Sequence, residues 1–129
     1  MSGASLPEMS VVVITPDRYE TVRKTVRHWK AQSVRGRLEI VLVAPSAVEL
    51  GLDKSEMQDF LQFRVIEVGP INSTAKARAI GVRHASAPVV ALSEDHAYPA
   101  PGWAEAIIIA HKDGWATVGP VMANANPEA

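Results

Sequence analysis

Three adjacent ionisable residues, Glu94, Asp95 and His96, are the strongest candidates for chemistry in this chain. They follow the apolar run Val89-Val90-Ala91-Leu92, which predicts that they leave the end of a buried strand. Because side chains alternate along a strand, we expect Glu94 and His96 on one side and Asp95 on the other. Carboxylate oxygens and an imidazole nitrogen are suitable ligands for Mn²⁺ or Mg²⁺, which could in turn hold a diphosphate. The alternative is a solvated polar loop with a capping role.

The elements that must position this cluster alternate between short β-branched runs and segments of helical period. That alternation is typical of βαβ units and a mostly parallel sheet, so we expect an α/β fold with helices flanking the sheet. The sequence predicts strands at residues 10–14, 38–43, 63–68, 89–92 and 117–122. It predicts helices that begin near Asp17, span residues 55–62 and 74–85, and begin near Pro101. Ligands of such sheets bind beyond the carboxyl ends of the strands, so the loops after the strands are the candidate site.

The first predicted helix has the clearest pattern. Asp17 and Glu20 have the spacing of a capping box, and Trp29 lies on its apolar face, as Trp103 does on that of the last helix. We expect both tryptophans in the core and His28 at the surface. Seven basic residues fall in this helix and the loop after it: Arg18, Arg23, Lys24, Arg27, Lys30, Arg35 and Arg37. We expect a solvated outer face, and a surface for anionic lipid or a lipid-linked acceptor is the alternative.

Composition restricts the classes of protein to consider. With 129 residues, 47% hydrophobic and 21% charged, the chain is expected to form a single packed domain over residues 1–129. A net charge of −1 provides no global field for nucleic acid, so we expect no nucleic-acid partner. The absence of cysteine excludes disulfides and thiolate chemistry and suits the cytoplasm. No apolar run approaches the roughly 20 residues of a membrane-spanning helix.

Motifs of three common α/β classes are missing. The loop Thr15-Pro16-Asp17-Arg18 contains no glycine, whereas a dinucleotide-binding oxidoreductase needs a glycine-rich turn after its first strand. No Gly-Lys-Ser or Gly-Lys-Thr is present, which excludes a P-loop, and no Gly-x-Ser-x-Gly is present, which excludes a serine nucleophile elbow.

Several motifs in order carry a family resemblance. They are Ser10-Val11-Val12-Val13-Ile14-Thr15-Pro16-Asp17-Arg18-Tyr19-Glu20-Thr21-Val22, Ala31-Gln32-Ser33, Glu39-Ile40-Val41-Leu42-Val43, Ala75-Lys76-Ala77-Arg78-Ala79-Ile80-Gly81-Val82, Val89-Val90-Ala91-Leu92-Ser93-Glu94-Asp95-His96, and Pro99, Pro101 and Trp103. Over residues 9–122 the chain resembles the nucleotide-binding half of a family 2 glycosyltransferase of the GT-A fold. The resemblance implies an inverting transferase whose donor is a nucleoside-diphosphate sugar.

The resemblance also implies roles for individual residues. The donor would be bound by Thr15, Pro16, Asp17, Ala44, Lys76, Arg78, Glu94 and Asp95. His96, with Glu94 and Asp95, would hold Mn²⁺ or Mg²⁺. The sequence departs from the family in three places. Ile14 and Pro16 flank Thr15, where the family often has Pro before the Thr and Tyr after it. Ala44 and Pro45 stand where many members have an acidic residue that reads the nucleoside, and His96 replaces the final Asp of the motif, which lowers the negative charge there.

The acceptor side of the reaction is not accounted for within the chain. The resemblance implies that the acceptor-binding part is absent and that the catalytic base lies beyond Ala129. The acceptor would be a saccharide or a lipid-linked molecule, and we expect the protein in the cytoplasm, with the inner face of a membrane as an alternative. A catalytically silent nucleotide-binding or protein-interaction module on the same scaffold is the alternative function.

Overall fold

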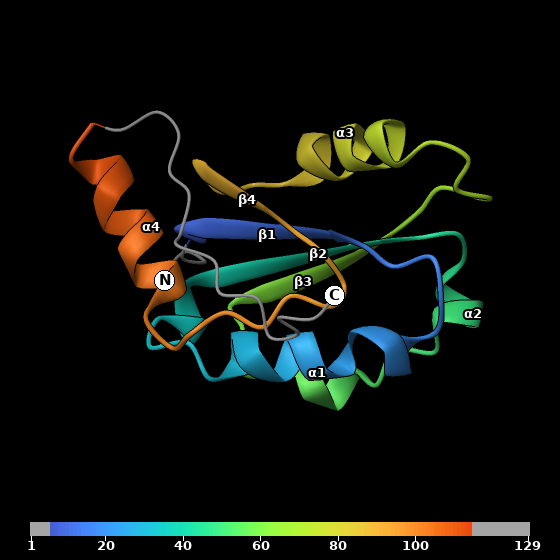
Figure 1. The fold of residues 1–129 in the computed structure, drawn as a ribbon, viewed down its shortest axis with the longest axis horizontal. Coiled ribbons are helices and arrows are strands. Elements are labelled where there is room, and N and C mark those ends of the chain that lie inside the picture. Colours follow the sequence, from blue (N-terminus) through green and yellow to red (C-terminus); the bar gives the residue numbers. More distant parts are fainter. Residues whose placement is uncertain (1–5, 115–129) are drawn as a thin grey trace, which may run out of the picture.

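The computed structural model describes residues 6–114, which form a parallel sheet flanked by helices (Figure 1). In chain order the elements are β1 (Met9–Ile14), α1 (Tyr19–Lys30), the 3-10 helix η1 (Arg35–Arg37), β2 (Leu38–Ala44), α2 (Ala47–Leu50), the 3-10 helix η2 (Lys54–Met57), β3 (Gln62–Glu67), α3 (Thr74–His84), β4 (Val89–Ser93) and α4 (Trp103–Lys112). The described strands are arranged β3-β2-β1-β4, and every pairing is parallel. The predicted α/β fold and its first four strands are confirmed, whereas the strand predicted at 117–122 lies outside the described residues.

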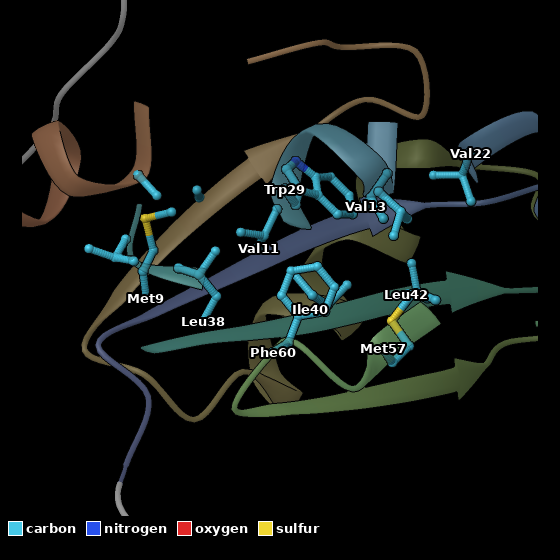
Figure 2. Close-up of a cluster of buried hydrophobic side chains, with 14 of the residues drawn as sticks. Met9, Val11, Val13, Val22, Trp29, Leu38, Ile40, Leu42, Met57 and Phe60 are labelled. Atoms are coloured by element: carbon cyan, nitrogen blue, oxygen red, sulfur yellow. The ribbon is translucent and has the colours of Figure 1, made fainter. Parts of the chain in front are cut away.

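Helices cover both faces of the central strands (Figure 1). Val11 and Val13 of β1 face α1, where they pack with Trp29 in the main hydrophobic core (Figure 2). Val12 of β1 faces the other way, into a smaller cluster that includes Ala77 of α3. Strands covered on both faces are expected to be apolar at successive positions, as β1 and β2 are.

The prediction of a helix at residues 55–62 is wrong. The chain instead forms the short helix α2, whose N-terminus is capped by Ser46 Oγ accepting from Glu49 N at 3.3 Å, and then η2. Asp53, rather than Ser55, caps η2, because Asp53 Oδ1 accepts from Ser55 N at 3.0 Å. Strand pairing ends this segment early, since Leu61 N already donates to Leu38 O at 3.0 Å.

The predicted capping box at Asp17 is also wrong. The N-cap of α1 is Arg18, which is extended (φ −76°, ψ 162°) and makes no side-chain cap hydrogen bond. The side chain of Asp17 is therefore one residue too early to reach the free N–H groups of the first turn.

The remaining helices and the tryptophans agree with the sequence predictions in most respects. The helix predicted at 74–85 is observed as α3, and α4 begins at Trp103, close to the expected Pro101. Trp29 is fully buried, and Trp103 is half-buried against the main core. None of the helices between residues 6 and 114 has the length and apolar character that crossing a membrane requires.

Candidate functional site

The candidate residues lie at the carboxyl edge of the sheet, where the strand order reverses. From β1 the chain passes to β2 on one side, and β4 later pairs with the other side of β1. Loops that leave neighbouring strands in opposite directions leave a crevice between them, which is where open parallel sheets bind ligands. The loops after β1 and β4 hold most of the sequence-predicted site residues.

A hollow of about 650 Å³ lies at this edge, between the loops that follow β1 and β2. It is lined by Pro16, Asp17, Arg18, Glu20, Thr21, Pro45, Ser46, Glu49 and Leu50. Pro16 and Asp17 are among the predicted donor residues. The wall formed by α2 was missed by sequence reasoning, although Ser46 with Glu49 three residues later, followed by Gly51, is a helix-capping signal that could have revealed it.

Two predicted donor residues support the hollow and do not line it. Thr15 is almost fully buried, and both its N–H and its hydroxyl donate to Val43 O, at 2.7 and 3.2 Å. These bonds hold the end of β1 against β2. Ala44 is fully buried in the main core. The side chains that reach the hollow come from the residues that follow these two.

The cluster after β4 has a different geometry from the predicted one. Its carboxylates do not face opposite sides, because Glu94 Oε2 lies 3.2 Å from His96 Nε2 and Asp95 Oδ1 lies 2.9 Å from His96 Nδ1. Strand alternation does not apply here, since β4 ends at Ser93 and the chain turns, with Ala97 N donating to Glu94 O at 3.3 Å. The hydrogen bond to Asp95 raises the pKa of His96 above its ordinary value, and the negative charge of Glu94 adds to this rise.

Both ring nitrogens of His96 lie within hydrogen-bonding distance of carboxylate oxygens, so coordination of a cation by the imidazole would require one of these contacts to open. Between residues 6 and 114, no group of three His, Asp or Glu side chains is placed to hold a metal ion. The Mn²⁺ or Mg²⁺ site at Glu94, Asp95 and His96 stays a prediction.

Lys76 and Arg78 lie on α3, which begins at the same edge after the loop from β3. The helix starts here because Ser73 Oγ accepts from Lys76 N at 3.2 Å. Lys76 is exposed and Arg78 is half-buried, and neither lines the hollow between the β1 and β2 loops. The structure therefore brings Pro16 and Asp17 together in one hollow and places the other predicted donor groups on separate elements of the same edge.

His28 differs from its predicted surface position. It is half-buried, with Nδ1 3.3 Å from Pro99 O and its ring centroid 5.4 Å from that of Tyr98. Sequence reasoning missed this contact because the two segments are 71 residues apart in the chain.

Comparisons with known proteins connect this fold to one set of solved structures. No protein-family model and no curated protein sequence matches the chain. The structure is similar to S. aureus TarS, with a TM-score of 0.67 and 17% identity over 81% of this chain and 20% of TarS. It is also similar to S. aureus TarS 1–349 in complex with UDP, with a TM-score of 0.71 and 14% identity over 82% of this chain and 32% of that one. The chain spans about a third or less of the length of these TarS chains. Together, the parallel sheet, its flanking helices and this similarity show a Rossmann-like α/β fold of the GT-A type.

Proposed function

We propose that this chain is the donor-binding part of a glycosyltransferase and binds the nucleoside diphosphate of a nucleotide sugar at the carboxyl edge of its sheet. The observation that carries the proposal is the structural similarity to TarS 1–349 in complex with UDP. The ordered motifs of the sequence, which resemble family 2 glycosyltransferases, add independent support.

The hollow between the β1 and β2 loops suits the nucleoside. Its volume of about 650 Å³ lies within the roughly 300–1,000 Å³ of small-molecule sites. Pro16 and Leu50 offer apolar surface to a base, and Asp17, Ser46 and Glu49 offer oxygens to base N–H groups and ribose hydroxyls. In this proposal the diphosphate extends from the hollow toward β4, and Lys76 and Arg78 of α3 offset its charge.

The proposed transfer joins the acceptor to the sugar with inversion. The acceptor oxygen forms a bond to the anomeric carbon as the bond from that carbon to the phosphate oxygen breaks. The acceptor proton passes to a base, and the nucleoside diphosphate leaves with the electron pair.

Thermal unfolding with UDP or GDP, each with and without Mn²⁺, tests donor binding. UDP at about 100 times its dissociation constant adds about 2.7 kcal/mol, or roughly 10 °C in Tm for a domain of this size. The Mn²⁺ arm tests the predicted cation separately, since dependence on both nucleotide and metal would support a site at Glu94, Asp95 and His96. No shift with either nucleotide, with or without Mn²⁺, would contradict the proposed function.

A pair of tryptophan variants locates the nucleotide. Thr21 is exposed and lines the hollow, so Thr21→Trp should fill it and weaken UDP binding by about tenfold or more. Val48 is 89% exposed on α2 and does not line the hollow, so Val48→Trp is the matched control and should bind UDP as the unmodified chain does. Equal UDP affinities for the two variants would place the nucleotide elsewhere.

A further inference from the structure

Polar side chains on α1 and just past its end bond to the segment that connects β4 to α4. Thr25 and His28 are three residues apart on one side of α1, and Gln32 follows two residues after the helix ends at Lys30. The loop, residues 94–102, runs alongside α1 on its way from β4 to α4 (Figure 1). We refer to Thr25, His28 and Gln32 as the polar row.

Thr25 holds the turn that carries the ionisable cluster. Its side chain is fully buried, and Oγ1 donates to Asp95 O at 3.0 Å. This carbonyl belongs to the peptide that joins Asp95 to His96, so the hydroxyl acts directly on the backbone between the two residues.

His28 holds the middle of the loop. Its Nδ1 lies 3.3 Å from Pro99 O, and its ring packs against Tyr98. One turn earlier on the helix, the ammonium of Lys24 lies 4.4 Å from the centroid of the Tyr98 ring, a cation–π contact. The aromatic ring therefore rests between two α1 side chains.

Gln32 holds the far end of the loop and the start of α4. Its Nε2 donates to Ala100 O at 2.8 Å and to His28 O at 3.1 Å, and its Oε1 accepts from Ala104 N at 2.9 Å. The Ala104 N–H lies in the first turn of α4, where helical N–H groups have no partner within their own helix. The N-cap, Gly102, has no side chain to serve it, so Gln32 provides the cap from the segment that follows α1.

The burial of this row has an energetic consequence. Thr25 and Gln32 are both fully buried, and burying polar groups is unfavourable unless they are hydrogen-bonded. Two of their side-chain bonds go to the loop, at Asp95 O and Ala100 O, and a third goes to Ala104 N at the start of α4. The row therefore stabilises one arrangement of a loop that has no regular structure.

We propose that Thr25, His28 and Gln32 are positioning residues that hold the Glu94–Asp95–His96 turn in place at the carboxyl edge for the incoming nucleotide. The ligand in this inference rests on the proposed function, whereas the ordering of the turn does not. The row touches the loop backbone and lies outside the hollow.

Backbone ¹⁵N relaxation of the 129-residue chain tests the ordering directly. Thr25→Val keeps the volume and removes the hydroxyl, whereas Thr25→Ser keeps the hydroxyl. Order parameters of residues 94–97 should fall from about 0.85 to below about 0.6 in Thr25→Val and recover in Thr25→Ser. Unchanged order in Thr25→Val, or equal loss in both variants, would overturn the inference.

A histidine pair provides a second comparison with a matched control. His28→Phe removes the bond to Pro99 O, whereas His84→Phe removes an equivalent bond from His84 Nδ1 to Ile80 O, which lies within α3. Order in residues 94–100 should fall in His28→Phe and stay unchanged in His84→Phe. Equal order in the two variants would count against the polar row.

Calorimetric titration with UDP separates positioning from a purely structural role. Loss of one such hydrogen bond should raise the Kd for UDP about tenfold in Thr25→Val and leave it within about twofold in Thr25→Ser. An unchanged Kd in a Thr25→Val chain whose turn has lost order would overturn the positioning role. If the unmodified chain does not bind UDP, the proposed function fails, and the relaxation data alone decide whether the polar row holds the turn.

Discussion

Glu39 is a fully buried carboxylate at the amino-terminal edge of the sheet, the end opposite to the candidate site. It accepts from Ser10 Oγ at 2.6 Å, from Ser86 N at 2.8 Å and Oγ at 2.9 Å, from Arg64 Nε at 2.9 Å and from Gln62 Nε2. Burial alone would raise the pKa of Glu39, but these hydrogen bonds outweigh it and lower the pKa to about 2. The carboxylate thereby joins three strands to the segment that follows α3.

This lowered pKa predicts acid sensitivity. The unfolded chain binds a proton on Glu39 near pH 4.5 and the folded chain only near pH 2, so stability from this group is complete above about pH 5. As the pH falls from 5 to 2, the free energy of unfolding should lose about 3 kcal/mol from Glu39. Urea denaturation across this range measures the loss.

Two variants isolate the contribution of Glu39. Glu39→Gln should lower the free energy of unfolding at pH 7 by about 3 kcal/mol, because amide hydrogens would face the Ser86 N–H and Arg64. It should also make the free energy of unfolding depend less on pH between 5 and 2, because the amide does not titrate. Glu105→Gln, an exposed change on α4, is the control and should follow the unmodified chain. Parallel acid profiles for Glu39→Gln and the unmodified chain would contradict the prediction.

The two acidic clusters show what can be predicted at the level of residues. The sequence predicts that Glu94, Asp95 and His96 act together because they are adjacent, and the structure does bring their side chains into contact. Nothing in the sequence indicates that Glu39 is the buried centre of a hydrogen-bond network, because its partners Ser10 and Ser86 lie 29 and 47 residues away. Local spacing reveals neighbours in sequence, whereas contacts between strands depend on register.

At the level of elements, two similar capping signals had different outcomes. Ser46 with Glu49 caps α2, whereas Asp17 with Glu20 does not cap α1. The start of α1 places Tyr19 at its first position, where this side chain is buried and its hydroxyl donates to Glu56 at 2.9 Å. A capping signal in the sequence does not include such tertiary contacts, which is why the strands and long helices were predicted better than the helix starts.

The packing of α3 on the sheet depends on a glycine. A Cβ at Gly81 would lie 2.6 Å from Val12 Cγ1 and 2.8 Å from Val43 Cγ2, both buried branches of β-strand valines. Gly81→Ala should lower the free energy of unfolding by about 1–3 kcal/mol, although alanine is the better helix former. Urea denaturation measures the change. Gly36→Ala, where a Cβ meets nothing within 4 Å, should change stability little, and a Gly81→Ala chain as stable as this control would contradict the close approach.

At the scale of the molecule, the two faces of the sheet are unequal. The α1 face carries the main core, which includes Trp29, Tyr19 and residues of α4, whereas the α3 face carries a small cluster around Val12, Val41 and Ala77. The apolar runs of β1 and β2 predict burial on both faces, but not this inequality, which arises because α3 contributes small side chains such as Ala77 to its side. Stability should therefore differ between the two layers.

Native-state hydrogen exchange in increasing urea tests this difference. Amides of β1, β2 and α1 should exchange only through global unfolding, and amides in the middle of α3 should exchange through an opening at least about 1 kcal/mol lower in free energy. Two adjacent valines of β1 serve as a matched pair, since Val12 faces α3 and Val13 faces α1. Val12→Ala should lower protection in α3 by more than it lowers global stability, because it removes the γ-methyl groups of Val12, and Cγ1 is the atom that packs against Gly81. Val13→Ala should lower protection in β1, β2 and α1 and leave the opening of α3 nearly unchanged, because Val13 stays packed in the main core when α3 opens. Protection in α3 equal to that in β1, or an equal response of α3 to both variants, would mean that the two layers unfold as one unit.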